Sequence, residues 1–292
     1  MASKRPSKIR LVRFTSQLIS FILLNAALIG ITFNLIVPFL HPFSSPLTNA
    51  GGAYELLLKL AIDLVFPFIP LAIFLIIAAI FGRAFCSWAC PFGFIQDLLG
   101  MIPVKKRNPS IKNEKRFSEI KFIILGISII LTIWVVIYKI QGAEAAIVQA
   151  LGPFAESPFE PLSPVTTLFA LIPWMIIRGT IADIFTGNLL LWLRLAILVG
   201  VLIMVIYIPR AWCRWLCPAG AFLGLFSKNS LLGIKRRITK CTTEKCAREC
   251  EAKCPMAIRI IQEPWKRIRH HNCTLCLNCK TCPEDAIEMT AP

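Results

Sequence analysis

Two stretches of this chain carry the same motif in the same register. Residues 81–100 read FGRAFCSWACPFGFIQDLLG, and residues 208–227 read IPRAWCRWLCPAGAFLGLFS. The positions that coincide without a gap are Arg83/Arg210, Ala84/Ala211, Cys86/Cys213, Trp88/Trp215, Cys90/Cys217, Pro91/Pro218, Gly93/Gly220 and Leu98/Leu225. Because chance does not readily place these residues in one register, we infer an internal duplication that sets the fold of the chain.

Each copy of the motif ends a pair of apolar segments. The sequence predicts membrane helices over residues 14–40, 56–81, 117–140 and 189–208, each long enough to cross about 30 Å of hydrocarbon. The composition agrees, since 56% of the residues are hydrophobic and 16% are charged, against about a quarter charged in soluble domains. We therefore expect an all-α membrane domain over residues 14–232, with four transmembrane helices built from a duplicated two-helix unit.

The distribution of charge predicts the topology. The formal net charge is +16, and the basic residues cluster in the N-terminal residues 1–13, in residues 105–116 and after Arg210. The intervening loops, residues 41–54 and 141–183, are neutral or acidic, so the positive-inside bias places both termini in the cytoplasm. We expect a multi-pass protein of the cell (cytoplasmic) membrane whose charge reports topology and not nucleic-acid binding.

Two apolar segments can each be interpreted in two ways. Residues 14–40 exceed the apolar core of a signal peptide and lack a small-residue cleavage site, so we expect a retained helix. Residues 165–177 are apolar but short and contain Pro173, which favours an interfacial or re-entrant segment over a fifth span.

The Cys-x3-Cys-Pro motif predicts paired thiols at the membrane boundary. Residues four apart share one helical face, so Cys86 and Cys90 point the same way, and so do Cys213 and Cys217. The following proline disfavours helix at the second cysteine. If the halves face each other, four thiolates converge, which suits an iron–sulfur cluster or another metal. Redox-active thiol pairs and simple packing remain open alternatives.

Eight of the 12 cysteines lie in the last 52 residues. Two runs each end in Cys-Pro, as in ferredoxins, where the last cysteine of a run serves the other cluster. That crossover predicts two [4Fe–4S] clusters, one held by Cys273, Cys276, Cys279 and Cys254 and the other by Cys241, Cys246, Cys250 and Cys282. The spacings depart from the regular pattern, and zinc ribbons are the structural alternative. We expect a small α+β ferredoxin-like domain over residues 233–292, with short strands at residues 257–258 and 286–287.

With these motifs in view, the chain resembles the NapH/NosR/CcoG group of membrane-bound polyferredoxins, and most closely the NapH-type subunit of quinol dehydrogenases. The resemblance rests on the paired CxxxCP motifs and the two Cys-Pro-terminated runs. It implies four spans, two cytoplasmic [4Fe–4S] clusters and electron exchange with the quinone pool and a partner reductase chain. The chain lacks the N-terminal flavin-binding domain of NosR-type members.

The predicted function is therefore electron transfer between a membrane carrier, quinone, and a redox partner protein. The partner would dock on a basic face formed by Lys235, Arg236, Arg237, Lys240, Lys266, Arg267 and Arg269. The alternative is a maturation or sensing factor that uses the CxxxCP thiols.

Other polar residues carry weaker predictions. A bis-histidine haem is excluded, because only His41 of the three histidines lies near a span. His270 and His271 are expected at the surface. Lys59 and Asp63 are expected in a structural ion pair, within their helix or across helices, and Trp88 and Trp215 at the membrane boundary.

Overall fold

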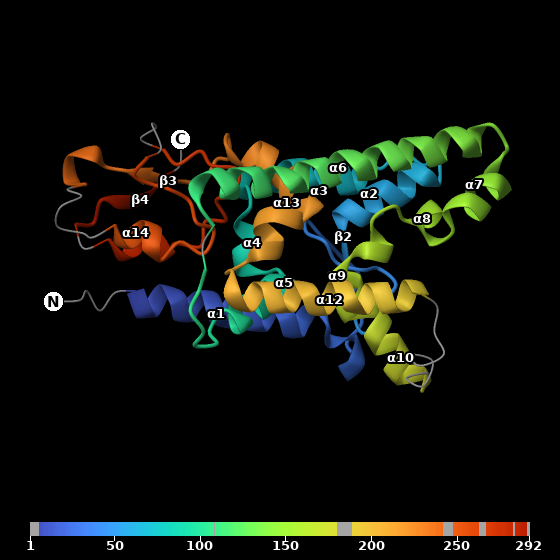
Figure 1. The fold of residues 1–292 in the computed structure, drawn as a ribbon, viewed down its shortest axis with the longest axis horizontal. Helices are drawn as coiled ribbons and strands as arrows, with labels where there is room; N and C mark the ends of the chain where they lie inside the picture. Colours follow the sequence, from blue (N-terminus) through green and yellow to red (C-terminus); the bar gives the residue numbers. More distant parts are fainter. Residues whose placement is uncertain are drawn as a thin grey trace.

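The computed structural model describes residues 6–107, 109–179, 189–241, 248–262, 267–282 and 284–290. The molecule is elongated, with long helices along its main axis and a cysteine-rich region, residues 233–290, at one end (Figure 1). Helix α1 (Pro6–Leu24) begins at that same end.

The first half of the chain contains α1 (Pro6–Leu24), η1 (Ala26–Ile29), β1 (Leu35–Val37), β2 (Ala50–Gly52), α2 (Ala53–Ile62), α3 (Phe68–Phe81), α4 (Ala84–Trp88), α5 (Pro91–Leu99) and α6 (Ile111–Ile140). The outer end of the bundle contains α7 (Glu144–Leu151), α8 (Pro153–Glu156), η2 (Glu160–Leu162), α9 (Pro164–Thr166), η3 (Thr167–Leu171) and α10 (Ile172–Arg178). The remainder contains α12 (Leu189–Tyr207), η5 (Trp212–Leu216), α13 (Pro218–Ser227), β3 (Gly233–Arg236), η6 (Ile238–Lys240), α14 (Glu249–Ala252), η7 (Asn278–Thr281) and β4 (Ile287–Thr290).

The helix packing follows the duplication. Helix α5, after the first motif, packs against α1 and α12, and α13, after the second motif, packs against α6 and α3. Exchanging α1 with α6, α3 with α12 and α5 with α13 therefore reproduces the same set of contacts. This is the arrangement expected for two parallel repeats related by a pseudo-twofold axis.

Two helices in the described part of the chain, α6 and α12, are long and apolar enough to cross a membrane. They correspond to the third and fourth predicted spans. Both expose large apolar side chains on their outer faces, such as Ile130 on α6 and Leu193 on α12. Apolar surface of this kind is stable against lipid and costly against water.

The predicted span over residues 14–40 is wrong beyond Leu24. Helix α1 ends there, and Gly30 adopts a left-handed conformation with φ 77°, which an α-helix cannot include. The chain then turns inward, and β1 pairs in parallel with β2. The predicted loop, residues 41–54, is mostly buried, since His41, Pro42, Ser45 and residues 49–54 lie in the interior, as do residues 37–40 before it.

The predicted span over residues 56–81 is two helices, α2 and α3, with a break at residues 63–67. Leu64 has a positive φ of 58°, and Pro67 has no N–H to donate. Asp63 forms its ion pair with Lys139 of α6 at 3.6 Å. The expectation of a structural pair thus holds across helices.

Residues 164–178 form one helical segment despite Pro173. The π-helical turn η3 lies directly before α10, and Pro173 occupies the first turn of that helix. A π-turn changes the hydrogen-bond pattern where a proline removes a donor, so the segment stays helical.

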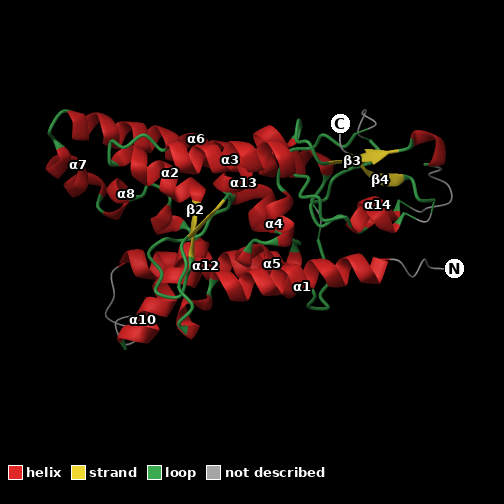
Figure 2. Ribbon diagram, turned by 180° about the vertical axis from the view of Figure 1, so that it is seen from behind, coloured by secondary structure: helices red, strands yellow, loops and turns green. Residues whose placement is uncertain are grey.

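The cysteine-rich region is held by one antiparallel pair, in which β3 pairs with β4 (Figure 2). The strand expected at residues 286–287 is present as β4. The strand expected at residues 257–258 is not, because Ala257 has a positive φ of 49° and the chain turns there.

Candidate functional site

Each CxxxCP motif places its two cysteines in different backbone conformations. Cys86 lies in α4 and Cys213 in the π-helical turn η5, whereas Cys90 and Cys217 are extended, with ψ of 120° and 113°. The proline explains the extended conformation, because it excludes the α region for the residue before it. It also begins the next helix, since its fixed φ suits the first helical position.

The second cysteine of each motif therefore caps a helix. The Gly93 N–H donates to Cys90 Sγ at 3.4 Å, and the Gly220 N–H donates to Cys217 Sγ at 3.3 Å. A Cβ at Gly93 would lie 2.5 Å from the Cys86 carbonyl oxygen, and one at Gly220 would lie 2.6 Å from Arg83 Nη2. Close packing against other residues of the two motifs thus requires the glycine that both copies share.

The two halves are joined crosswise by their arginines. Arg83 Nη2 donates to the Cys213 carbonyl oxygen at 2.8 Å, and Arg210 Nη1 donates to the Cys86 carbonyl oxygen at 3.3 Å. Gln96 Nε2 of the first half also donates to Cys213 Sγ at 3.0 Å. The structure therefore brings the two motifs together in one layer. We call this layer, formed by residues 83–93 and 210–220, the motif layer.

All four motif cysteines are buried and reduced, with exposed fractions of 4–8%. Burial raises the pKa of Cys217 to about 12, and the neighbouring Cys213 and Cys86 add to this shift. Burial, Cys213 and Cys86 likewise raise the pKa of Cys90. Without a cationic ligand, the thiols of Cys90 and Cys217 are therefore protonated at neutral pH.

Among the described residues, no three His, Cys, Asp or Glu side chains are arranged to hold a single metal ion. The charges around the thiols determine whether an iron–sulfur group fits this layer. Arg83 and Lys121 are both fully buried, and both donate to Asn272 Oδ1. Neither has a carboxylate partner within the described ranges, and Arg83 Nε has no hydrogen-bond acceptor there.

The buried guanidinium of Arg83, together with the buried amino group of Lys121, forms an environment for an anion beside the thiols. An unpaired buried charge costs several kcal/mol, about 3–5 when one partner of a buried pair is missing. A thiolate-ligated iron–sulfur cluster carries net negative charge, and Cys86, Cys213 and Cys217 lie within electrostatic range of Lys121. The residues of this layer therefore fit such a group, held by Cys86, Cys90, Cys213 and Cys217, which would supply one-electron redox chemistry.

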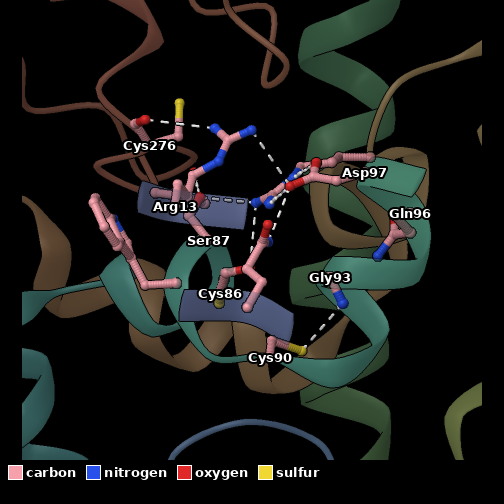
Figure 3. A network of polar contacts seen from close by, with 12 residues as sticks. Arg13, Cys86, Ser87, Cys90, Gly93, Gln96, Asp97 and Cys276 are labelled. Carbon is pink, nitrogen blue, oxygen red and sulfur yellow. Dashed lines mark hydrogen bonds and ion pairs between the residues drawn. The ribbon is translucent and has the colours of Figure 1, made fainter. Parts of the chain in front are cut away.

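A second buried charge network surrounds Asp97 (Figure 3). Arg210 donates to both Asp97 oxygens, at 2.7 and 2.6 Å, Arg13 lies 3.6 Å away, and Gln17 donates at 3.0 Å. Burial alone would raise the pKa of the Asp97 carboxyl, but Arg210 and Arg13 outweigh it and hold the pKa below its ordinary value. Asp97 is thus an anion that fixes the arginine bound to the Cys86 carbonyl.

The motif layer is hydrogen-bonded directly to the cysteine-rich region. Ser87 Oγ donates to Thr274 Oγ1 at 2.7 Å, and Trp88 Nε1 donates to the Leu275 carbonyl oxygen at 3.1 Å. Arg13 Nη1 donates to the Cys276 carbonyl oxygen at 3.4 Å. Ser87 directly follows Cys86, and Thr274 and Leu275 lie between Cys273 and Cys276, so these bonds join the first motif to the cysteine-rich region.

Four of the C-terminal cysteines line one small, enclosed apolar cavity: Cys254, Cys273, Cys276 and Cys279. They are the four residues predicted to share a cluster. Burial raises the pKa of Cys279, with contributions from Cys276 and Cys273, and burial raises the pKa of Cys254 to about 12. The cavity walls include isoleucines from separate segments, such as Ile234 and Ile258, and such walls exclude water from a bound group.

The second predicted set is described only in part. Cys246 lies outside the described residues. Cys250 is buried in α14, whereas Cys241 and Cys282 are half-buried. This second ligand set stays a prediction.

The irregular cysteine spacing has a structural cause. Before each Cys-Pro, one residue has a left-handed backbone conformation and a single helical turn follows it. Arg248 (φ 57°) precedes α14, and Leu277 (φ 59°) precedes η7. The turn is α-helical in the first run and 3₁₀ in the second. Since a 3₁₀ turn needs fewer residues than an α turn, the shorter gap before Cys282 fits the same arrangement.

Sequence reasoning missed most of the polar partners of the motif cysteines. Asp97, Gln96, Arg13, Thr274 and Asn272 were not singled out. Lys121 gave a usable signal, because a lysine within an apolar helix marks a functional candidate. Arg83 and Arg210 were visible as repeated residues, but without an assigned role.

Two other predictions are modified by contacts. Trp88 and Trp215 are not simple membrane anchors, since their ring N–H groups donate to Leu275 and to Glu114. His270 and His271 are half-buried and not fully exposed, and His271 Nε2 lies 3.3 Å from Ser118 Oγ.

Comparison with known proteins adds a family match over part of the chain. A family described as "4Fe-4S binding domain" matches two separate segments, residues 64–110 and 190–239. Each segment contains one CxxxCP motif, so the duplication inferred from the sequence is detected independently, and the cluster-binding description falls on the motif layer. No solved structure gives a significant match.

Relatives match across most of the chain. An uncharacterized protein of Methanocaldococcus jannaschii, MJ0750, is 28% identical over 75% of this chain and 77% of its own length. The regulatory protein NosR of Pseudomonas aeruginosa is 29% identical over 69% of this chain and 24% of its own length. The ferredoxin-type protein NapH of Haemophilus influenzae is 24% identical over 82% and 71%.

The resemblance to the NapH/NosR group is confirmed. Relatives of this chain also include the ferredoxin-type protein MauN and the putative electron transport protein YccM. Together with the family match and the two membrane-capable helices α6 and α12, these relatives support iron–sulfur electron transport at a membrane. Because NapH is not more similar to the chain than NosR, the finer assignment to the NapH type stays a prediction.

Proposed function

We propose that this protein passes single electrons between the quinone pool and a redox partner protein, through the CxxxCP layer and two [4Fe–4S] clusters of a ferredoxin-like domain. The observation that carries the proposal is the Ser87–Thr274 hydrogen bond of 2.7 Å. Because each residue neighbours a predicted ligand, chain geometry limits the Cα separation of Cys86 and Cys273 to about 15 Å. Redox groups held there would be close enough for direct electron transfer.

The proposed topology has four membrane passages with both termini in the cytoplasm. Helix α1 is about 28 Å long at 1.5 Å per residue, with its basic first part, up to Arg13, at the cytoplasmic boundary, and α2 with α3 form one interrupted passage beside α6 and α12. Such interruptions are tolerated at membrane depth where protein covers the free backbone.

The redox partner would dock on the basic face of the ferredoxin-like domain, where Lys235, Arg237 and Lys240 are exposed. Lys266 lies outside the described residues.

Burial argues against the thiol-exchange alternative. A thiol that attacks a partner's disulfide must be accessible and ionised, whereas all four motif cysteines are buried. A fixed ligand set needs no access from outside, and a bound metal ion keeps its thiolates ionised.

Low-temperature EPR of the anaerobically purified full chain tests the proposal. Cluster signals that appear on adding quinol support a quinol-oxidising conduit and set the direction of flow. Signals that need a strong reductant leave quinone reduction as the direction. The absence of any iron–sulfur signal under every reductant contradicts the proposed function.

A matched pair of variants tests the link between the two cysteine sets. Thr274→Val removes the hydroxyl that accepts from Ser87, and Thr48→Val removes a hydroxyl in the loop before β2, far along the chain from both sets. Freeze-quench EPR should show slower electron distribution between the clusters in Thr274→Val alone. Equal rates in both variants would argue against this route.

A further inference from the structure

A groove of about 600 Å³ runs along α1 and reaches the first CxxxCP motif. One wall is a face of α1 that includes Thr15, Ser16 and Ser20. The opposite wall includes Phe33, and the inner end is Ala89, the residue directly before Cys90. The groove therefore connects the outside of the bundle to the backbone of a predicted redox site.

The groove opens toward the membrane. Helix α1 lies at the edge of the helix bundle (Figure 1), and the groove residues Ile19 and Leu23 are 58% and 47% exposed. The volume falls within the roughly 300–1,000 Å³ of small-molecule sites. A ligand that enters here comes from the lipid phase, so it is an amphipathic, membrane-soluble molecule.

The hydroxyl groups of the groove are arranged as acceptors. Ser16 Oγ donates to the Trp88 carbonyl oxygen at 3.0 Å, Ser20 Oγ to the Ala89 carbonyl oxygen at 2.8 Å, and Thr15 Oγ1 to the Val12 carbonyl oxygen at 2.9 Å. A hydroxyl has one proton and two acceptor lone pairs. Since each proton is already used, the oxygens can accept a hydrogen bond but cannot donate one.

This polarity distinguishes the two redox forms of a quinone. A hydroquinone has two O–H donors, which match the free lone pairs of Ser16 and Ser20. The oxidised quinone has only carbonyl acceptors, which could bond here only if a serine gave up its backbone carbonyl. Leaving a buried carbonyl unpaired costs about 1–3 kcal/mol.

We infer that this groove binds the hydroquinone form of the membrane quinone, in preference to the oxidised form, next to the first CxxxCP motif. The inference rests on the proposed function for the identity of the ligand. It adds the place of binding, the residues that bind and the redox form that is favoured. Trp88, whose carbonyl accepts from Ser16, also donates through its ring N–H to the Leu275 carbonyl beside Cys276, so one residue links a groove hydroxyl to the cysteine-rich region.

Filling the groove tests the inference. Ile19→Trp places a large ring in the groove without touching a hydroxyl, and Leu18→Trp is the matched control, on the same helix and 38% exposed but outside the groove. Direct binding is measured on the full chain in nanodiscs, with a radiolabelled short-chain quinol kept reduced, and separately with its quinone. We expect the quinol to bind the wild type and Leu18→Trp at least tenfold more tightly than the quinone, and Ile19→Trp to lose at least tenfold in quinol affinity.

The double variant Ser16→Ala/Ser20→Ala tests the preference, with Ser227→Ala as control because its hydroxyl also donates to a backbone carbonyl but lies on α13. The double variant should bind both redox forms equally, and iron content verifies that each variant is folded. Equal affinity of the wild type for quinol and quinone overturns the inference, as does the absence of saturable binding, which would leave the groove to phospholipid chains.

EPR on the same samples separates this inference from the proposed function. If quinol still reduces the clusters of Ile19→Trp at the wild-type rate, the groove is not the site and electron transfer from quinol stands. If the wild type binds quinol in the groove but shows no cluster signal with any reductant, the binding site stands and the proposed function fails.

Discussion

Arg83 of the first repeat donates a 2.8 Å hydrogen bond to the carbonyl oxygen of Cys213 in the second repeat. Arg210 makes the reciprocal bond to Cys86. The pair explains why the arginine recurs three residues before the first cysteine of each motif. Each arginine fixes the cysteine backbone of the other half, and Arg83 also adds a buried positive charge without a carboxylate partner among the described residues.

Replacing Arg83 by Gln should lower the reduction potential of a cluster in the motif layer. Removing a nearby cation makes an anionic centre harder to reduce, by about 1–2 kcal/mol at an effective dielectric constant near 20, or roughly 50 mV for one electron. An EPR-monitored redox titration measures the shift. Arg83→Lys should keep most of the wild-type potential, and Arg237→Gln, at an exposed position, should leave it unchanged. A potential unaffected by Arg83→Gln would separate this charge from the redox centre.

Asp97→Asn should destabilise the protein by about 3–5 kcal/mol, because Arg210 and Arg13 would lose the carboxylate that neutralises them. The matched control is Asp63→Asn, whose half-exposed carboxylate pairs with Lys139 and should matter by less than about 1 kcal/mol. Thermal unfolding in detergent compares the two. Similar small losses in both variants would contradict the role assigned to the Asp97 network.

The stability contributed by Asp97 should also depend on pH. Its folded-state pKa lies below the ordinary value of 3.8, so its contribution is present above pH 3.8 and is lost as the pH falls through the lower folded value. In wild type the unfolding temperature should therefore fall in this acid range by more than in Asp97→Asn, which has no proton to bind there. Parallel pH profiles in the two proteins would show that Asp97 is not held ionised by its arginines.

The repeat and the two long spans were predictable because they depend on local sequence. A proline fixes the residue before it, so the extended conformation of Cys90 and Cys217 followed from the sequence alone. Apolar runs of sufficient length likewise predicted α6 and α12. The crossed hydrogen bonds of Arg83 and Arg210 were not predictable, because they join residues more than a hundred positions apart and depend on how the halves pack.

The first half of the membrane domain was predicted least well. Residues 25–40 look like the continuation of a membrane helix because they are apolar, and residues 41–54 look like an exposed loop, since proline, serine and glycine are frequent there. In the structure the parallel pairing of β1 with β2 satisfies their backbone groups, and that pairing permits burial. Hydropathy also missed the break between α2 and α3, because Leu64 and Val65 are as apolar as the helices on either side.

Gly93→Ala should disturb the motif layer. The added methyl group would lie 2.5 Å from the Cys86 carbonyl oxygen, so that carbonyl must move and its bond to Arg210 must weaken. We expect a loss of about 1–3 kcal/mol, together with reduced iron retention. Gly200→Ala in α12 meets no atom within 4 Å and should be neutral or slightly stabilising. Equal iron content in the two variants would contradict a ligand role for this layer.

The ligand of the motif layer can be identified by counting iron. If Cys86, Cys90, Cys213 and Cys217 hold a third four-iron cluster, Cys217→Ser should remove about a third of the bound iron from the anaerobically purified protein. Cys279→Ser, in the cavity of the cysteine-rich region, should remove a similar fraction but a different EPR signal. If the motif thiols are instead free, Cys217→Ser keeps all the iron, and the wild-type cysteines react with a thiol reagent once detergent loosens the layer. The two outcomes differ in iron stoichiometry, so a colorimetric iron assay with protein quantitation decides between a cluster and paired thiols.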